Sequence, residues 1–203
     1  EPFSNEAFRL ALMYATDREL FAQSLDGYDT ASAIIPPEVK ILNQNYRETA
    51  DGKIAPAYSL SKAQSLMKTA LQELDRDYLN SLTLIVPDDV EIKENISYIL
   101  QQWQKDLGFF CKVEALSDAQ LESRIKSGDY SFAITKLGGD YNSPKAFLSR
   151  FLTGNSQNYT GFKSAEFKEL LDGAEQADSL SESAELYRKA EAEVLSKAVF
   201  IPL

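Results

Sequence analysis

The stretch Leu82-Thr-Leu-Ile-Val86-Pro-Asp-Asp89 decides the fold, because it is an apolar, strand-like run that ends in turn residues. A long helix that ends at Gly108 is expected next, and its predicted buried face consists of Ile92, Ile96, Ile99, Trp103 and Leu107. Residues 109–115 and 130–137 predict two further strands, and a capping box at Ser117 opens a short helix between them. This β-α-β-α-β order predicts an α/β fold, in which a mainly parallel sheet carries helices on both faces.

The residues on either side of this segment predict more helices and one extended segment. A helix begins after Ser4 or Asn5 and Asp17 starts another; their expected buried residues are Phe8, Ala11, Leu12, Ala15, Leu20, Phe21 and Leu25. A helix over 60–74 should bury Leu60, Ala63, Leu66, Met67 and Ala70. Ile34-Ile35-Pro36-Pro37 forces an extended segment. The last two helices should bury Phe167, Leu170, Leu171 and Ala174, and then Ala184, Tyr187, Ala190, Val194 and Leu195.

The corner Thr135-Lys-Leu-Gly-Gly-Asp140-Tyr-Asn-Ser-Pro-Lys-Ala-Phe-Leu148 follows the third predicted strand. Ligands bind at this carboxyl edge in open α/β sheets. Gly138 and Gly139 leave the main chain open to an extended ligand backbone, and Asp140 could neutralise the ammonium group of that ligand. Asp140 could instead only close a turn, and the residues by themselves favour neither interpretation. Ser143 and Pro144 are expected to cap and begin the next helix.

Composition excludes several classes of function. The 203 residues carry a net charge of -10, whereas nucleic acid calls for clustered Lys and Arg, so we expect no nucleic-acid partner. The chain contains no histidine, which removes Ser–His and Cys–His nucleophile pairs and histidine metal sites. The single cysteine, Cys111, lies in an apolar run and is predicted to be a buried structural thiol. Catalysis would have to rest on carboxylates, Lys or Tyr. We therefore expect no enzyme and no metal or cofactor site, and a carboxylate-dependent hydrolase stays as the alternative.

Two remaining patterns of possible chemistry also have simpler explanations. Asp88 and Asp89 could lie along the same sheet edge as Asp140, but residues of this type after a strand are typical turn residues and helix N-caps. Gly138-Gly139 lacks the Gly-x-Gly-x-x-Gly spacing that opens a dinucleotide-binding helix.

The chain has no apolar run of transmembrane length and no signal peptide. It ends in an apolar, strand-like run, Val199–Leu203, so we expect a piece of a longer protein.

Seven segments, in order, resemble the extracytoplasmic solute-binding proteins of peptide ABC transporters, the oligopeptide- and dipeptide-binding family known as family 5. They are Asn5–Arg18, Ile34–Pro37, Ser61–Met67, Leu100–Gly108, Gly128–Phe132, Asp140–Pro144 and Tyr187–Glu191 with Ile201–Leu203. The segment Asp140-Tyr-Asn-Ser-Pro144 is similar to the family's Asp-Tyr-x-x-Pro signature. The resemblance implies a periplasmic-binding-protein-like (type II) lobe, with residues 1–203 forming the single continuous second lobe and the partner lobe absent.

The resemblance also implies the ligand contacts. In the peptide-binding members the signature aspartate holds the α-ammonium of the peptide, a role that falls on Asp140, with Tyr141 beside it. The neighbouring strand end pairs with the peptide main chain, which implicates Leu137, Gly138 and Gly139. Many members carry Trp where this chain has Leu137, so the aromatic wall of a side-chain pocket is reduced and the ligand class stays open.

The function implied is that of a solute-binding component of an ABC importer outside the cytoplasm, in the periplasm or as a cell-surface lipoprotein. Such a component captures peptides by closure of two lobes and delivers them to the permease, and this chain would supply half the site. The same lobe could alternatively bind a nickel complex, a haem-like group or a sugar, or serve as the sensor domain of a transcriptional regulator.

Overall fold

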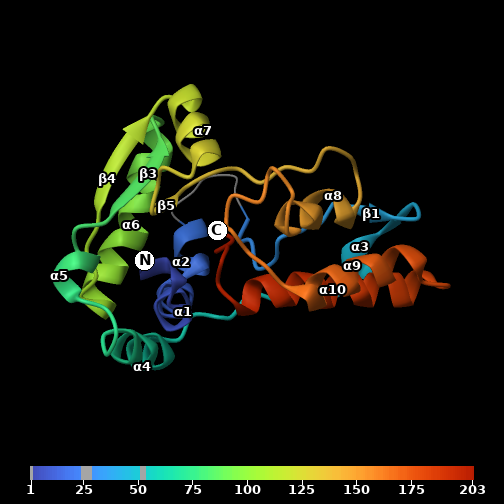
Figure 1. Ribbon diagram of the computed structural model, residues 1–203, viewed down its shortest axis with the longest axis horizontal. Coiled ribbons are helices and arrows are strands. Elements are labelled where there is room, and N and C mark those ends of the chain that lie inside the picture. The colour runs from blue at the N-terminus through green and yellow to red at the C-terminus, as the bar shows by residue number, and fades with distance from the viewer. Residues whose placement is uncertain (1, 24–28, 51–53) are drawn as a thin grey trace. The chain divides into compact units, whose positions relative to one another are not determined.

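The computed structural model describes residues 2–23, 29–50 and 54–203. The chain divides into two compact units, which are described separately. Unit 1 consists of Glu1–Thr30, Ala57–Lys136 and Leu203, and unit 2 consists of Ala31–Pro56 and Leu137–Pro202. Figure 1 shows the sheet within unit 1 and the long C-terminal helices within unit 2.

The predicted parallel sheet forms the centre of unit 1. Its strands are β3 (Thr83–Pro87), β4 (Lys112–Leu116) and β5 (Phe132–Ala133), in the order β4-β3-β5 and all parallel. Helix α6 (Val90–Leu107) joins β3 to β4, and α7 (Asp118–Ser127) joins β4 to β5; both contact β3. Since the two crossovers run in opposite directions along the sheet, right-handed connections put the two helices on opposite faces. The α/β prediction is confirmed.

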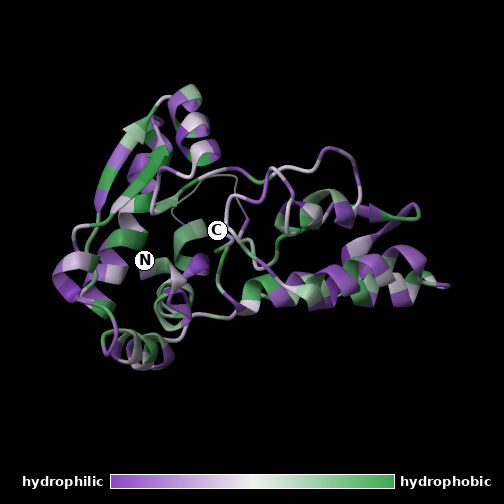
Figure 2. Cartoon of the chain, in the orientation of Figure 1, coloured by the Kyte–Doolittle hydropathy of each residue, from purple (hydrophilic) through white to green (hydrophobic). Residues whose placement is uncertain are grey.

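The helix boundaries of unit 1 follow from the capping residues. The Asp89 side chain accepts a hydrogen bond from the Ile92 N–H at the start of α6, and Gly108 ends that helix with φ 63°. Ser117 and Gln120 form the predicted capping box of α7. The central strand β3 buries Leu84, Ile85 and Val86, and it is mostly hydrophobic in Figure 2.

The remaining elements of unit 1 pack as helices around an aromatic cluster. They are η1 (Pro2–Ser4), α1 (Glu6–Ala15), α2 (Arg18–Gln23), α4 (Leu60–Ala70) and α5 (Arg76–Leu79), and α1 packs along α4. The ring of Phe8 stands edge-on to Phe109 with centroids 5.3 Å apart, and Phe3 lies 4.9 Å from Phe132. Asn5 and Asp17 cap α1 and α2 as predicted, through the N–H groups of Phe8 and Leu20.

Two residues predicted to be buried in unit 1 are exposed. Leu20 is 57% exposed, because α2 turns Arg18 inward and a residue two positions further lies on the opposite side of a helix. Leu60 is 38% exposed and is the first residue of α4, whose buried residues begin at Ala63. Leu25 lies outside the described residues, and Ile92 and Leu66 are half-buried.

The second and third strands are shorter than predicted, for identifiable reasons. β4 begins at Lys112 because the Phe109 ring joins the aromatic cluster and the Phe110 N–H bonds to the side chain of Asn80. In the third strand the Ile134 N–H donates to the Ile85 carbonyl, and the next bond in a parallel ladder would come from the N–H of residue 87. That residue is Pro87, which has no N–H, so the ladder stops and β5 covers only Phe132–Ala133.

Unit 2 consists of helices and one small hairpin. The hairpin strands are β1 (Lys40–Ile41) and β2 (Gln44–Asn45), followed by α3 (Tyr46–Thr49). After them come α8 (Pro144–Leu148), η2 (Ser149–Phe151), α9 (Ala165–Gln176) and α10 (Leu180–Ser196). Helices α9 and α10 pack together through the predicted apolar faces, although Leu170 is only half-buried. The final run Val199–Leu203 forms no strand.

Candidate ligand-binding site

The predicted binding loop, residues 137–141, follows β5 but does not continue it. β5 ends at Ala133, so Leu137, Gly138 and Gly139 lie in irregular backbone rather than at a strand end. Within the part of the chain that the structure describes, the main-chain N–H and C=O groups of these three residues form no hydrogen bond. Gly138 and Gly139 are exposed to solvent. These unpaired groups can therefore bond to a ligand main chain.

Gly139 is held tightly against the helix that follows the loop. A Cβ atom at this position would lie 2.6 Å from Cε2 of Phe147, whose ring on α8 is 8% exposed. No atom lies within 4 Å of the corresponding point at Gly138. Gly139 is thus needed for close approach of the loop to α8, whereas Gly138 is not constrained in this way.

Asp140 forms an ion pair within unit 2. Its Oδ1 accepts a hydrogen bond of 3.0 Å from Nη2 of Arg150 on η2. The Asp140 side chain is 71% exposed, whereas that of Arg150 is 18% exposed. Oδ2 of Asp140 accepts no hydrogen bond from the residues that the structure describes, so one carboxylate oxygen is open to a ligand cation.

The rest of the signature fixes the far end of the loop. The Asn142 side chain accepts a hydrogen bond of 2.7 Å from the Lys40 N–H of the hairpin. Pro144 is the first residue of α8, as predicted, but the Ser143 side chain forms no capping hydrogen bond. Tyr141 is 55% exposed. Three residues of the loop therefore contact different neighbours: Gly139 contacts Phe147, Asp140 contacts Arg150 and Asn142 contacts Lys40. Tyr141 stays accessible to solvent.

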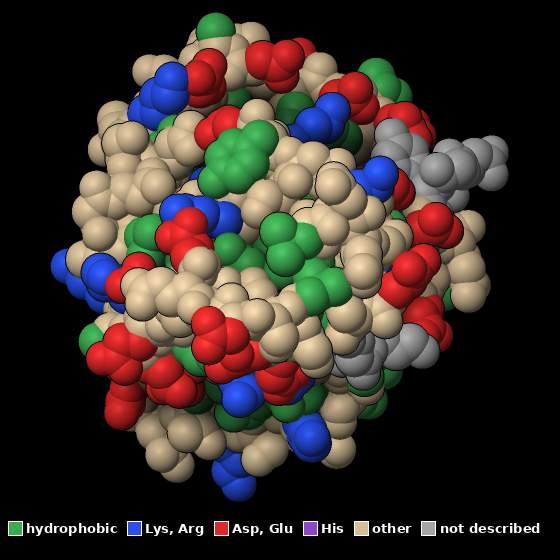
Figure 3. Space-filling view, turned by 90° about the vertical axis from the view of Figure 1, so that its right-hand side faces the viewer, with side chains coloured by type: hydrophobic (Ala, Val, Ile, Leu, Met, Phe, Trp, Pro, Cys, Tyr) green, Lys and Arg blue, Asp and Glu red, His purple; other side chains and the backbone are tan. Residues whose placement is uncertain are grey.

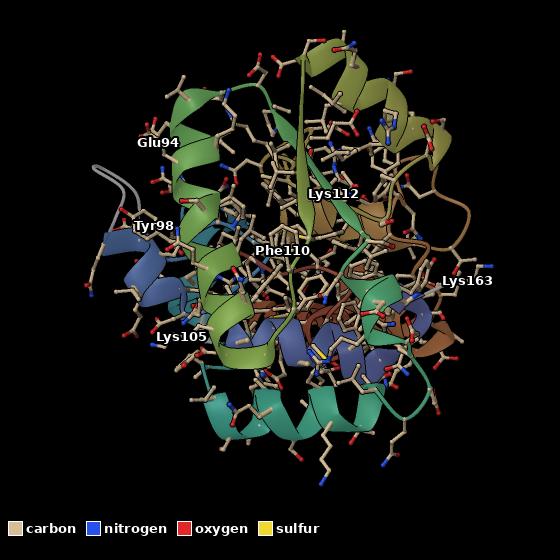
Figure 4. All side chains as sticks on the ribbon, turned by 90° about the vertical axis from the view of Figure 1, so that its left-hand side faces the viewer. Glu94, Tyr98, Lys105, Phe110, Lys112 and Lys163 are labelled. Carbon is tan, nitrogen blue, oxygen red and sulfur yellow. The ribbon has the colours of Figure 1, made fainter. Side chains whose placement is uncertain are left out.

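The other candidate groups have structural roles. Asp89 caps α6, and Asp88 pairs with Lys93 at 2.6 Å, as expected of turn residues. Cys111 is buried, and the loss of solvation raises the pKa of its thiol to about 12. Figure 4 shows the outer side of α6, where Glu94, Tyr98 and Lys105 project as separate side chains. The loop 137–141 remains the best-defined candidate site.

Sequence reasoning missed Arg150, which is part of this site. The signal was present, because Arg150 is the one charged residue within the run Ala146-Phe-Leu-Ser-Arg-Phe-Leu152. A charged residue at a largely buried position calls for a partner. It also missed the buried carboxylate of Glu191, which lies on the apolar face of α10.

On the face that Figure 3 shows, hydrophobic side chains gather near the centre and acidic ones border them.

Comparison with solved structures identifies the fold. The substrate-binding domain of an oligopeptide ABC transporter from Bacillus anthracis strain Ames superposes with a TM-score of 0.88. The match covers 100% of this chain and 40% of that chain at 22% sequence identity, and it shows that the two share a fold. The type II periplasmic-binding-protein-like fold predicted above is thereby confirmed.

The family follows from the sequence. Residues 1–159 match the family described as bacterial extracellular solute-binding proteins, family 5 Middle. The chain therefore belongs to the bacterial extracellular solute-binding proteins of family 5. This family works outside the cytoplasm, and no helix among the described residues is both long and apolar enough to cross a membrane.

Several curated relatives match the chain along its full length, and two of them show how different their named ligands are. The dipeptide-binding protein of Bacillus subtilis (strain 168) is 28% identical over 206 residues, which are 100% of this chain and 38% of that protein. Heme-binding protein A of Haemophilus influenzae is also 28% identical, over 100% of this chain and 37% of that protein. The chain thus spans well under half the length of these relatives, and both relatives are named as binding proteins rather than enzymes.

Proposed function

We propose that residues 1–203 form the second lobe of a two-lobed solute-binding protein that captures peptides for an ABC importer. The lobe supplies half of the binding site, and closure of two lobes around the peptide completes it. Family membership and the shared fold support this proposal. The chain binds and releases its ligand without chemical change, so it is not an enzyme.

The observation that carries the proposal is the loop that joins an accessible carboxylate to unpaired main-chain groups. Asp140 presents one open oxygen, and the neighbouring N–H and C=O groups of 137–139 are unsatisfied within the described residues. The N-terminus of a peptide has the matching chemistry, with a positive ammonium group followed by main-chain donors and acceptors. A charge-assisted contact of this kind contributes about 1.5–3 kcal/mol, or roughly 10- to 100-fold in affinity.

The proposal extends to partners and location. The partners are the peptide, the first lobe of the same protein and the permease subunits of the transporter. The complete protein acts in the periplasm, or at the cell surface as an anchored lipoprotein. The main alternative is a non-peptide solute, because one relative is named for heme and Leu137 replaces a common tryptophan.

Identification of the natural ligand tests the proposal. The complete two-lobed protein would be purified without refolding, and native mass spectrometry would give the mass of any bound ligand. A set of masses that fragments into peptide sequences is expected. A single mass that matches a porphyrin or another non-peptide solute would overturn the peptide assignment.

Calorimetry then separates the half-site from the complete site. A mixture of short peptides should bind the two-lobed protein, and this 203-residue chain should bind the same mixture much more weakly. Equal affinity of the two proteins would contradict the proposal that this chain holds only half of the site. A denaturant melt of the isolated chain serves as the control for folding.

A further inference from the structure

The geometry of the ion pair between Asp140 and Arg150 affects which ligand cations can bind to Asp140. Arg150 approaches through Nη2 alone, and the contact to Oδ1 is 3.0 Å. Nε of Arg150 is buried and has no hydrogen-bond partner among the residues that the structure describes. The pair is therefore end-on rather than the two-bond fork that arginine and a carboxylate commonly form. One oxygen of Asp140 is used and the other is open.

The side chain of Arg150 is much less exposed than the carboxylate that it contacts. Its side chain is 18% exposed, whereas that of Asp140 is 71% exposed. Arg150 belongs to η2, whose next residue Phe151 is buried and stacks edge-on against Phe200 with centroids 6.0 Å apart. Gly139, the residue before Asp140, is pressed against Phe147. The loop is thus packed on α8 at Gly139, and Oδ1 is the oxygen of Asp140 that contacts Arg150.

A carboxylate with one engaged oxygen discriminates between the two cations found in biological ligands. An ammonium group is a compact charge whose three donors can bond to one carboxylate oxygen and to nearby carbonyl groups. A guanidinium group is planar and gains most from two parallel bonds to both oxygens of one carboxylate. Because Arg150 already donates to Oδ1, a ligand guanidinium must compete with it for the second of those two bonds, and two positive groups would then share one oxygen.

We propose that Arg150 is a positioning and specificity residue, which competes with the ligand for one oxygen of Asp140 and so makes the site prefer ligands with a primary ammonium group over ligands with a guanidinium group. This inference rests on the proposed function, since it requires that Asp140 contact the ligand cation. The inference assigns a role to Arg150, which lies outside the segment Asp140–Pro144. It also states which ligand cation the site prefers. Arg150 itself makes no contact with the ligand.

The test compares three forms of one peptide, which differ only at the N-terminus. The forms carry the free α-ammonium, an α-guanidinium made by guanidinylation, or an N-acetyl group without charge. Calorimetry measures the affinity of each form for the complete two-lobed protein and for its R150M and R150K variants. Methionine keeps an unbranched apolar stem without a donor, whereas lysine keeps a donor and the positive charge.

The wild-type protein should bind the ammonium form about tenfold more tightly than the guanidinium form, the effect of one charge-assisted hydrogen bond. In R150M both oxygens are open, so the guanidinium form should gain and the two affinities should become nearly equal. R150K should keep most of the wild-type preference. A general structural disturbance would lower all three affinities together and leave their ratio unchanged.

Each outcome separates this inference from the proposed function. If no form of the peptide binds the wild type, the proposed function fails. If the acetylated peptide binds the wild type as tightly as the ammonium form, Asp140 is not a cation anchor and this inference fails while peptide capture stands. If the ammonium group matters but the ammonium-to-guanidinium ratio is the same in wild type and R150M, the role of Arg150 is wrong while the proposed function stands. R150M is expected to fold, because it removes a buried donor that has no partner. A thermal melt checks this, and R150K provides the comparison if the melt changes.

Discussion

The carboxylate of Glu191 on α10 lies 2.6 Å from the guanidinium of Arg47, and the Glu191 side chain is completely buried. The same carboxylate accepts hydrogen bonds from the N–H groups of Ile34 and Ile35, at 2.6 and 2.7 Å. Arg47 in turn donates to the carbonyl of Ile35. One buried charge therefore connects the segment before the hairpin, helix α3 and helix α10 within unit 2.

Glu191→Gln should destabilise the protein strongly. The substitution keeps the size of the side chain but leaves Arg47, whose side chain is 12% exposed, without its charge partner. Removal of one partner from a buried ion pair costs about 3–5 kcal/mol. Urea unfolding followed by circular dichroism measures the change in the free energy of unfolding.

The matched control for this substitution is Glu185→Gln on the same helix. Glu185 pairs with Arg188 at 2.7 Å, but both side chains are substantially exposed. The control should change the free energy of unfolding by less than about 1 kcal/mol. If both substitutions have the same small effect, the Glu191 network does not hold unit 2 together.

Gly139→Ala should loosen the loop, whereas Gly138→Ala should not. The new Cβ at position 139 would meet the buried ring of Phe147 at 2.6 Å, so loop or ring must shift, at a cost of about 1–3 kcal/mol. At position 138 there is space, and we expect a change within about 0.5 kcal/mol. Thermal melts of the two variants check this difference. Indistinguishable melts would mean that the loop is not packed on α8.

High pH should destabilise the protein through two buried acids. Burial raises the pKa of Cys111 from 9.0 to about 12 and that of Tyr187 from 10.0 to about 12. Between the ordinary and the raised pKa the unfolded chain has lost protons that the folded protein keeps. The free energy of unfolding therefore falls as the pH rises through this window, by up to about 1.4 kcal/mol per pH unit for each group.

Variants without these acids isolate the effect. Cys111→Ala should show a shallower decline of stability than the wild type from about pH 9, and Tyr187→Phe from about pH 10, because each removes one shifted group. Urea titrations at several alkaline pH values give the slopes. Parallel curves for the wild type and both variants would show that neither group titrates in this way.

Local sequence signals predicted most of unit 1 correctly. Asn5, Asp17, Asp89 and the Ser117 capping box begin helices as expected, and Gly108 ends α6. These signals succeed because a cap depends on contacts within a few residues of the chain. The predicted length of the third strand was wrong because the strand ends opposite Pro87. That residue is distant in sequence, and it can be placed opposite the third strand only once the strand pairing is known.

The candidate site was predicted in part. The apolar pattern and the glycines identified the loop that carries Asp140, and the structure keeps its main chain unpaired among the described residues. The residues that contact the loop could not be predicted from the spacing of apolar residues in the sequence. Arg150 and Phe147 meet the loop only after α8 folds back along it, and the hairpin residue Lys40 lies about a hundred positions earlier in the chain.

The role of Asp140 as an ammonium anchor is tested most directly by a thermodynamic cycle on the complete two-lobed protein. The affinities of a free-amine peptide and its N-acetylated form would be measured for the wild type and for Asp140→Asn, with Asp178→Asn as a control at an exposed site in the same unit. The wild type and the control should prefer the free amine by roughly 10- to 100-fold. Asp140→Asn should bind both peptides equally well. If Asp140→Asn keeps the full preference for the free amine, Asp140 does not hold the ligand cation.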